Sequence, residues 1–138
     1  MHCRPRVLIV EDDVLIADLT EELLTGNGFE VCGVVNSVKD ALDVGRWQAP
    51  DLALIDYGLK DGERGTEVGT KLRERSKLGI LYVTGQNSLS FLQDAIGEAY
   101  LVKPYLSIDL VCSLEIVLGL ALTGKLKRSL PRGLQLLS

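Results

Sequence analysis

Short apolar runs in this sequence end in side chains that can do chemistry. A run at residues 7–10 leads directly into three carboxylates, and later runs end in a carboxylate, a hydroxyl and an amine. These residues are Glu11, Asp12, Asp13, Asp56, Thr84 and Lys103. Grouped carboxylates are hard oxygen ligands of the kind that Mg²⁺ prefers, and a carboxylate beside such an ion can attack phosphorus to form an aspartyl phosphate.

Phosphoryl transfer of that kind needs few groups. A carboxylate nucleophile is already ionised at pH 7, so no histidine base is required. The charge on the phosphoryl oxygens must be neutralised, and a metal ion, an ammonium group and a hydroxyl donor can do this from three sides. Lys103 and Thr84 are candidates for the last two roles. Asp13 fits another role, because it stands where it can cap the helix that follows.

The elements that must position these residues alternate between strand-like runs and segments of helical periodicity. We predict strands at 6–10, 29–35, 52–56, 79–84 and 99–103. We predict helices at 14–25, from Ser37 to just before Pro50, at about 64–75 and at 107–122. This alternation is typical of a doubly wound α/β fold with a five-stranded parallel sheet and helices on both faces. Ligands bind beyond the carboxyl ends of such strands, so we expect the candidate residues to meet at one edge.

Four motifs occur in a characteristic order along the chain. Acids follow the first predicted strand, Asp56 the third, Thr84 the fourth and Lys103-Pro104 the fifth. This pattern, over about residues 5–122, resembles the receiver domain of two-component response regulators. The resemblance implies a flavodoxin-like (βα)5 sheet of strand order 2-1-3-4-5. It also implies that a partner histidine kinase or phosphotransfer protein donates a phosphoryl group while Mg²⁺ is bound.

The resemblance assigns a metal site and an acceptor residue by number. Asp56 would be the phosphoryl acceptor and also a metal ligand. Asp12 would bind Mg²⁺ directly, and Glu11 would act mostly through water. The backbone carbonyl of Gly58 would be a further protein ligand.

The same resemblance assigns a switch. Lys103 would pair with Asp56 at rest and with the phosphoryl group afterwards, and its bond to Pro104 would be cis. Thr84 would donate a hydrogen bond to the phosphoryl group and draw its loop inward. Tyr100 matches the aromatic switch position and would move inward with Thr84, although simple packing in the sheet is the alternative reading.

Two segments depart from the family pattern. In the loop after Asp56, Lys60 stands where proline is common, and Gly58 and Gly62 add conformational freedom. Only 15 residues separate Thr84 from Tyr100, which predicts a shortened fourth helix of about two turns. The resemblance also implies that Gln86, two residues after Thr84, would influence hydrolysis of the acyl phosphate.

The last predicted helix is more apolar than a single packed face requires. Leu110, Leu114, Val117 and Ala121 can face the sheet. A second apolar stripe remains, formed by Val111, Ile116, Leu118, Leu120 and Leu122. We therefore expect a homodimer, or another partner, to cover this stripe.

Length, charge and cysteine content limit the domain number, the partners and the location that we expect. The 138 residues suit one receiver domain at 1–124, followed by a tail at 125–138 that is basic and carries no acid. This tail is expected to be either a docking arm or, more commonly, a solvated terminus, and no output domain is expected. The net charge of −4 argues against direct nucleic-acid binding. With no signal segment or membrane span expected, and Cys3, Cys32 and Cys112 interpreted as ordinary thiols, a cytoplasmic location is predicted.

The sequence favours a stand-alone phospho-acceptor domain, rather than a conventional enzyme, that signals to a downstream protein not yet identified. Three alternatives stay open: a receiver-like scaffold that never turns over phosphate, a phosphate relay or sink, and a phosphatase or mutase on a similar scaffold. The last lacks the inserted cap and second catalytic acid that such reactions need. The lone histidine, His2, lies at the start of the chain and cannot serve as an internal phosphodonor.

Overall fold

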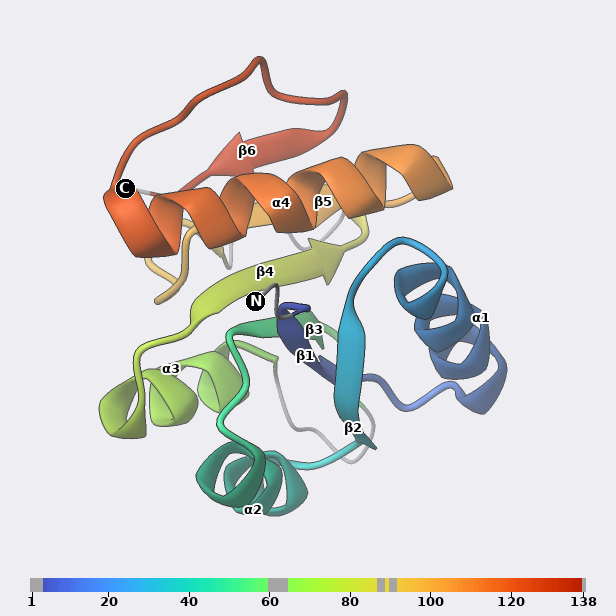
Figure 1. Ribbon diagram of the computed structural model, residues 1–138, viewed down its shortest axis with the longest axis vertical. Coiled ribbons are helices and arrows are strands. Elements are labelled where there is room, and N and C mark those ends of the chain that lie inside the picture. The colour runs from blue at the N-terminus through green and yellow to red at the C-terminus, as the bar shows by residue number, and fades with distance from the viewer. Residues whose placement is uncertain (1–3, 60–64, 87–88, 90–91, 138) are drawn as a thin grey trace.

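The computed structural model describes residues 4–59, 65–86, 89 and 92–137, so the predictions on His2, Cys3, Lys60 and Gly62 fall outside it. The chain forms a central sheet with helices on both faces (Figure 1). The strands are β1 (Arg6–Val10), β2 (Glu30–Val35), β3 (Leu52–Asp56), β4 (Gly79–Thr84), β5 (Ala99–Val102) and β6 (Leu134–Leu136). The helices are α1 (Val14–Thr25), α2 (Val38–Gln48), α3 (Gly65–Arg75) and α4 (Ser107–Thr123). None of these helices combines the length and the apolar character needed to cross a bilayer.

The sheet has the order β2-β1-β3-β4-β5-β6. Its first five strands are parallel, which confirms the predicted order 2-1-3-4-5. The register pairs Asp56 with Val83 and Thr84 with Val102, so the carboxyl ends of β3, β4 and β5 lie level with one another. The sixth strand, antiparallel to β5, was not predicted.

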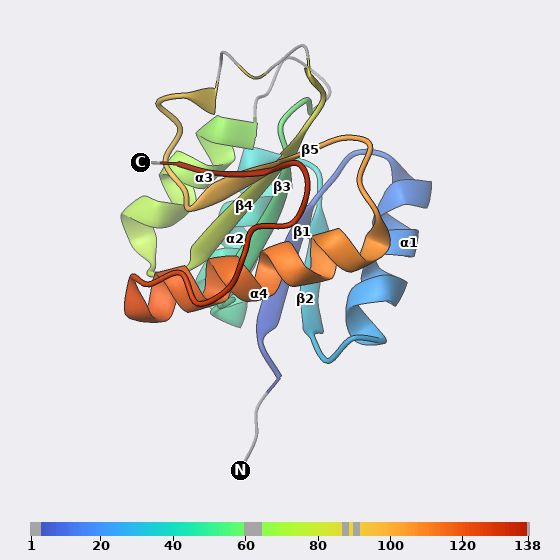
Figure 2. The same cartoon turned by 90° about the horizontal axis from the view of Figure 1, so that it is seen from above.

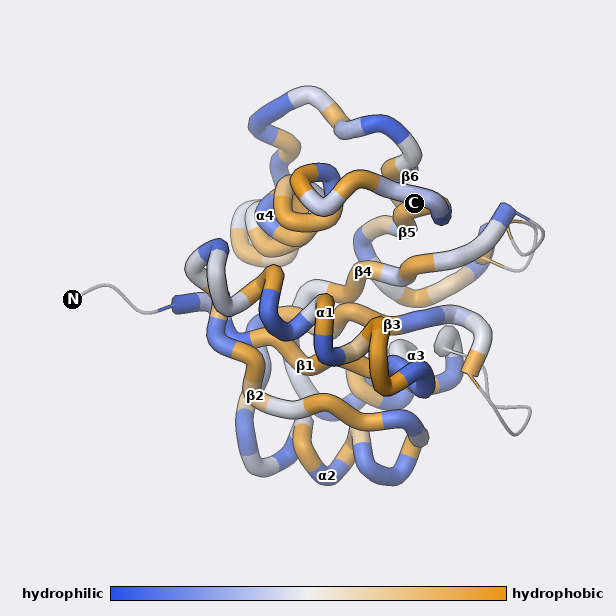
Figure 3. The backbone as a smooth tube through the Cα atoms, turned by 90° about the vertical axis from the view of Figure 1, so that its right-hand side faces the viewer, coloured by the Kyte–Doolittle hydropathy of each residue, from blue (hydrophilic) through white to orange (hydrophobic). Residues whose placement is uncertain are grey.

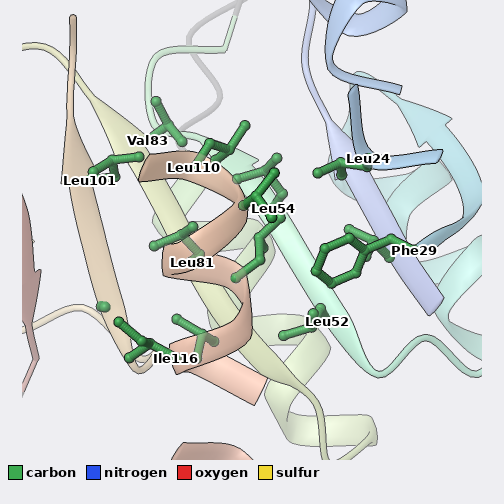
Figure 4. Close-up of a cluster of buried hydrophobic side chains, with 14 of the residues drawn as sticks. Leu24, Phe29, Leu52, Leu54, Leu81, Val83, Leu101, Leu110 and Ile116 are labelled. Carbon is green, nitrogen blue, oxygen red and sulfur yellow. The ribbon is translucent and has the colours of Figure 1, made fainter. Parts of the chain in front are cut away.

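Alternate residues of each strand pack on opposite faces of the sheet. In β1, Val7 and Ile9 belong to the core cluster beneath α1 and α4, whereas Leu8 and Val10 belong to the cluster beneath α2 and α3. Figure 4 shows the first cluster, in which α4 side chains lie over β3, β4 and β5. The strands that are apolar along most of their length are the central ones, covered from both sides (Figure 3). This double burial explains why the runs at β1, β3 and β4 are continuously apolar.

Helix caps form where the sequence predicted them. The Asp13 carboxylate accepts hydrogen bonds from the backbone N–H groups of Leu15 at 3.0 Å and Ile16 at 3.1 Å. The Ser37 hydroxyl accepts one from Asp40 N–H at 3.2 Å. These contacts satisfy N–H groups at the first turns of α1 and α2, which otherwise have no partner within the helix.

The described residues of the 85–98 connection contain no α-helix, and part of the shortened fourth helix predicted there falls on residues outside those that the structure describes. The connection instead packs directly on Tyr82. The Tyr82 hydroxyl donates to the carbonyl of Ile96 at 2.6 Å, and a Cβ on Gly97 would lie 2.9 Å from the Tyr82 ring. These contacts hold the end of the connection, just before β5, close to the sheet.

The C-terminal segment is exposed in one part and paired with the sheet in another. After α4 the chain turns back along the helix and ends beside β5 (Figure 1 and Figure 2). Residues 124–130 are exposed, but Leu134 is only 2% exposed and residues 134–136 pair with β5. A solvated, partly ordered terminus was the expectation, and the ordered part is this last segment, where Leu134 packs in the core cluster.

The second stripe of α4 is mostly covered. Val111 and Ile116 are buried, and Leu118 and Leu120 pack partly buried against the core cluster, which leaves Leu122 at 75% exposed. The prediction of a continuous exposed stripe is thus wrong, since the sheet and its neighbours cover a wider arc of α4 than one face. The expected contact of Ala121 with the sheet is also wrong, because this residue is exposed. A homodimer through α4 stays a prediction.

Candidate functional site

The site lies at the carboxyl edge of the sheet and centres on Asp56. The Lys103 ammonium lies 3.2 Å from Asp56 Oδ1, and the Asp56 side chain is only 14% exposed. The Lys103 backbone N–H donates to the carbonyl of Thr84 at 2.7 Å, which fixes the end of β5 against the end of β4. The peptide bond from Lys103 to Pro104 is cis, as expected.

Glu11 lies next to Asp56. Its pKa is raised from 4.5 to about 7, first by burial and then by the negative charge of Asp56, with a side-chain hydrogen bond to Asp56 adding to the effect. The hydrogen bond from Asp13 N–H at 3.3 Å and the positive charge of Lys103 act in the opposite direction. Two carboxylates thus crowd one ammonium, and a proton or a further cation would relieve their repulsion.

Asp12 lies half-buried beside a hollow of about 220 Å³ that Glu11, Val14, Asn36 and Asp40 also line. The described residues contain no group of three or more His, Cys, Asp or Glu side chains that could hold a metal ion. The roles of Glu11, Asp12 and Asp56 as metal ligands stay predictions. The adjoining carboxylates of Glu11 and Asp56 nevertheless provide hard, negatively charged oxygen ligands, which suit Mg²⁺.

Thr84 ends β4, and Tyr100 lies within β5. Thr84 is 1% exposed, and its hydroxyl donates to the carbonyl of Gly85 at 3.1 Å. Tyr100 pairs with Tyr82 in the sheet and packs, partly buried, against the cluster beneath α2 and α3. Two other predicted residues, Gly58 and Gln86, are exposed just beyond β3 and β4. Their predicted roles remain predictions.

Tyr105 adjoins the site, although no sequence pattern pointed to it. It is partly buried against the core cluster, and its pKa is raised first by burial and then by the charges of Glu11 and Asp56. Its phenol therefore lies within electrostatic reach of both acids. The only signal in the sequence is its position two residues after Lys103, at the start of the connection to α4.

The fold and the site together define a doubly wound α/β domain with a lysine-paired aspartate at the carboxyl edge of its sheet. Residues 7–115 match the family of response regulator receiver domains, and the chain belongs to that family.

Curated relatives include PdtaR, a transcriptional regulatory protein of Mycobacterium tuberculosis (strain ATCC 25618 / H37Rv), which is 28% identical over 117 residues. That alignment covers 83% of this chain and 57% of PdtaR. The sensory transduction protein RegX3 of Mycolicibacterium smegmatis is 34% identical, with 81% of this chain and 50% of RegX3 covered. This chain thus spans about half the length of these relatives.

Solved structures give the same family. A CheY-like response regulator receiver domain protein from Methanospirillum hungatei superposes with a TM-score of 0.76 at 29% identity, covering 88% of this chain and 99% of that one. The signal receiver domain of a modulated diguanylate cyclase from Desulfovibrio desulfuricans gives a TM-score of 0.77 at 28% identity, with the same coverage.

Proposed function

We propose that this domain accepts a phosphoryl group on Asp56 from a histidine kinase or phosphotransfer protein and signals by contact with a downstream protein. The observation that carries this proposal is the Asp56 carboxylate held 3.2 Å from the Lys103 ammonium at the carboxyl edge of the sheet. A largely buried nucleophile with a cation beside it matches what phosphoryl transfer requires.

In the transfer step, an Asp56 oxygen attacks phosphorus in the donor's phosphohistidine. A new O–P bond forms, the N–P bond breaks, and the imidazole leaves with the electron pair. Lys103 neutralises charge on the phosphoryl oxygens, and Thr84 turns its hydroxyl from Gly85 towards them. Both donors are positioned by the same link, the hydrogen bond from Lys103 N–H to the Thr84 carbonyl.

Mg²⁺, when bound, supplies the remaining neutralisation of charge. Glu11 and Asp56 would hold it, together with Asp12 and the carbonyl of Gly58 that the family resemblance assigns. The ion would also stabilise the ionised form of Glu11, whose pKa burial and the Asp56 charge raise to about 7.

The surface around the acceptor suits a docking partner. Val14, Leu15 and Leu19 on α1 are 73%, 67% and 58% exposed, and α1 begins directly after the acidic residues. Leu106 and Ile108, which follow Tyr105, are 67% and 65% exposed. Apolar side chains that frame a polar site in this way support approach of a kinase or phosphotransfer protein, which would occur in the cytoplasm.

One alternative stays open. It is a receiver-like scaffold that does not turn over phosphate. The two functions differ in whether Asp56 reacts.

The deciding experiment is incubation with acetyl phosphate and Mg²⁺, followed by intact-mass measurement. We expect one phosphoryl adduct that Asp56→Asn abolishes and that Asp43→Asn, a change at an exposed acid of α2, leaves in place. No adduct on the unaltered domain would favour the scaffold, and an adduct that persists unchanged in Asp56→Asn would show that Asp56 is not the acceptor.

A further inference from the structure

The outer edge of β5 carries backbone groups that β6 satisfies. We propose that this edge is a docking site for an extended segment of a partner protein, and that the chain's own β6 covers it as a displaceable strand. The partner segment would pair antiparallel with β5 and place one apolar side chain where Leu134 lies. This proposal does not depend on phosphorylation of Asp56.

The pairing of β6 shows which backbone geometry the edge accepts. Three residue pairs form the ladder: Ala99 with Leu136, Tyr100 with Gln135, and Leu101 with Leu134. Two hydrogen bonds extend it, from Val102 N–H to the Gly133 carbonyl at 3.0 Å and from Leu137 N–H to the Glu98 carbonyl at 2.9 Å. The edge therefore takes an antiparallel segment of about five residues, which is the usual mode of strand addition.

The side chain that this edge can recognise is the one at the position of Leu134. Leu134 is 2% exposed and belongs to the core cluster with Leu101 and Leu110, whereas Gln135 is exposed. Gly133 precedes Leu134 with a φ of +85°, a conformation that favours glycine. A partner segment should thus carry glycine, then an aliphatic residue, then a polar residue.

The present occupant is held by few contacts. β6 has three residues, and the connection from Gly124 to Leu130 is exposed. Along that connection, the ion pair of Arg128 with Glu115 at 3.3 Å has both side chains about half exposed, so it adds little stability. Short strands with exposed connections lie at the low end of local stability, and a competing strand can replace them.

A partner strand bound at this edge of β5 would lie next to residues of the site around Asp56. Tyr100 is the central residue of the ladder with β6, and Lys103 follows the last residue of β5. A partner strand would therefore contact the strand that carries the candidate switch tyrosine and leads into the acceptor's lysine.

A pair of proline substitutions in the full chain tests displacement. Because the Gly133 carbonyl and the Leu137 N–H face β5, the Gln135 N–H also faces β5, while the Leu136 N–H faces away. Gln135→Pro should release β6, and Leu136→Pro, one residue further on, should leave the ladder intact. The probe is a fluorescent peptide of residues 131–137, followed by anisotropy.

We expect the Gln135→Pro chain to bind this peptide roughly tenfold or more tightly than the unaltered chain or Leu136→Pro, because its own tethered strand no longer competes. A peptide carrying Leu134→Asp should not bind. Equal binding by all three chains, or binding that ignores Leu134→Asp, would overturn the proposal.

Hydrogen exchange on the unaltered protein gives a test that does not depend on any variant's folding. The Val102 and Leu137 amides should exchange at least roughly 100-fold faster than the Leu81 amide in the central strand. Equal protection would show that β6 is a permanent part of the sheet. Light scattering measures the oligomeric state of the unaltered chain. A monomer supports a partner other than this chain, whereas a dimer that the peptide dissociates would assign the edge to a second copy of the chain.

Discussion

Replacing Glu11 by glutamine should stabilise the metal-free domain at alkaline pH. Glu11 shares its half-buried position with Asp56, and its pKa is raised from 4.5 to about 7, chiefly by burial and then by the Asp56 charge. Glutamine keeps the size of the side chain and can still hydrogen-bond, but it carries no charge. The substitution therefore removes the repulsion without opening a cavity.

The direction of the effect follows from proton linkage. Below pH 4.5, Glu11 is protonated in both the folded and unfolded states, and its ionisation costs no stability. As the pH rises from about 4.5 to about 7, the unfolded chain ionises first, so the free energy of unfolding falls. The loss is complete above pH 7, where an upper limit of about 3 kcal/mol corresponds to the difference between the two pKa values. Because Glu11 is partly exposed, solvent screening reduces this to roughly 1–2 kcal/mol.

Urea unfolding in EDTA, followed by circular dichroism at pH 5 and pH 8, measures this directly. The gain from Glu11→Gln should be larger at pH 8 than at pH 5, and Glu21→Gln, at an exposed position of α1, should show no such difference. Adding Mg²⁺ at pH 8 should stabilise the unaltered domain more than Glu11→Gln. An equal gain at both pH values, or none at pH 8, would refute the electrostatic reasoning.

Two further substitutions test the acceptor and the packing beneath it. Lys103→Met should slow phosphorylation by acetyl phosphate on the order of 10²-fold, because it removes the ammonium group that neutralises charge on the phosphoryl oxygens. Lys39→Met, at an exposed position, should not slow it. Intact-mass spectra taken at timed intervals measure both rates. Equal rates for the two variants would exclude Lys103 from the transfer step. Gly69→Ala should lower the free energy of unfolding by about 1–3 kcal/mol, since overpacking a core costs about this much. Its Cβ would lie 2.0 Å from the Tyr82 hydroxyl, while Gly119→Ala in α4 meets open space. Thermal unfolding that ranks these two glycine variants the other way would contradict the packing argument.

The strands and caps were predictable because local patterns determine them. Continuous apolar runs report burial on both faces, and Asp13 and Ser37 mark helix starts through hydrogen bonds that span two or three residues. The meeting of Asp56 and Lys103 followed from the rule that parallel strands end at a common edge.

The remaining features depend on contacts between distant segments. β6 has three residues within a basic tail, and only the site that accepts Leu134 makes it a strand. The path of the 85–98 connection depends on the Tyr82 hydroxyl reaching Ile96, and the coverage of Leu118 and Leu120 depends on how deeply α4 sits. No sequence period records such contacts.

The two ends of β5 have a common property. Glu98, just before the strand, accepts hydrogen bonds from Arg73 at 2.7 Å and from Ile80 N–H at 2.8 Å, and Lys103, just after it, pairs with Asp56. An ion pair thus anchors each end of this strand, and the second pair also joins the end of β5 to the end of β3. The two carboxylates are mostly buried, at 17% and 14% exposed, so salt should screen these pairs much less than the exposed pair of Arg128 with Glu115. The strand that leads into Lys103 should therefore keep its place in the sheet over a wide range of ionic strength.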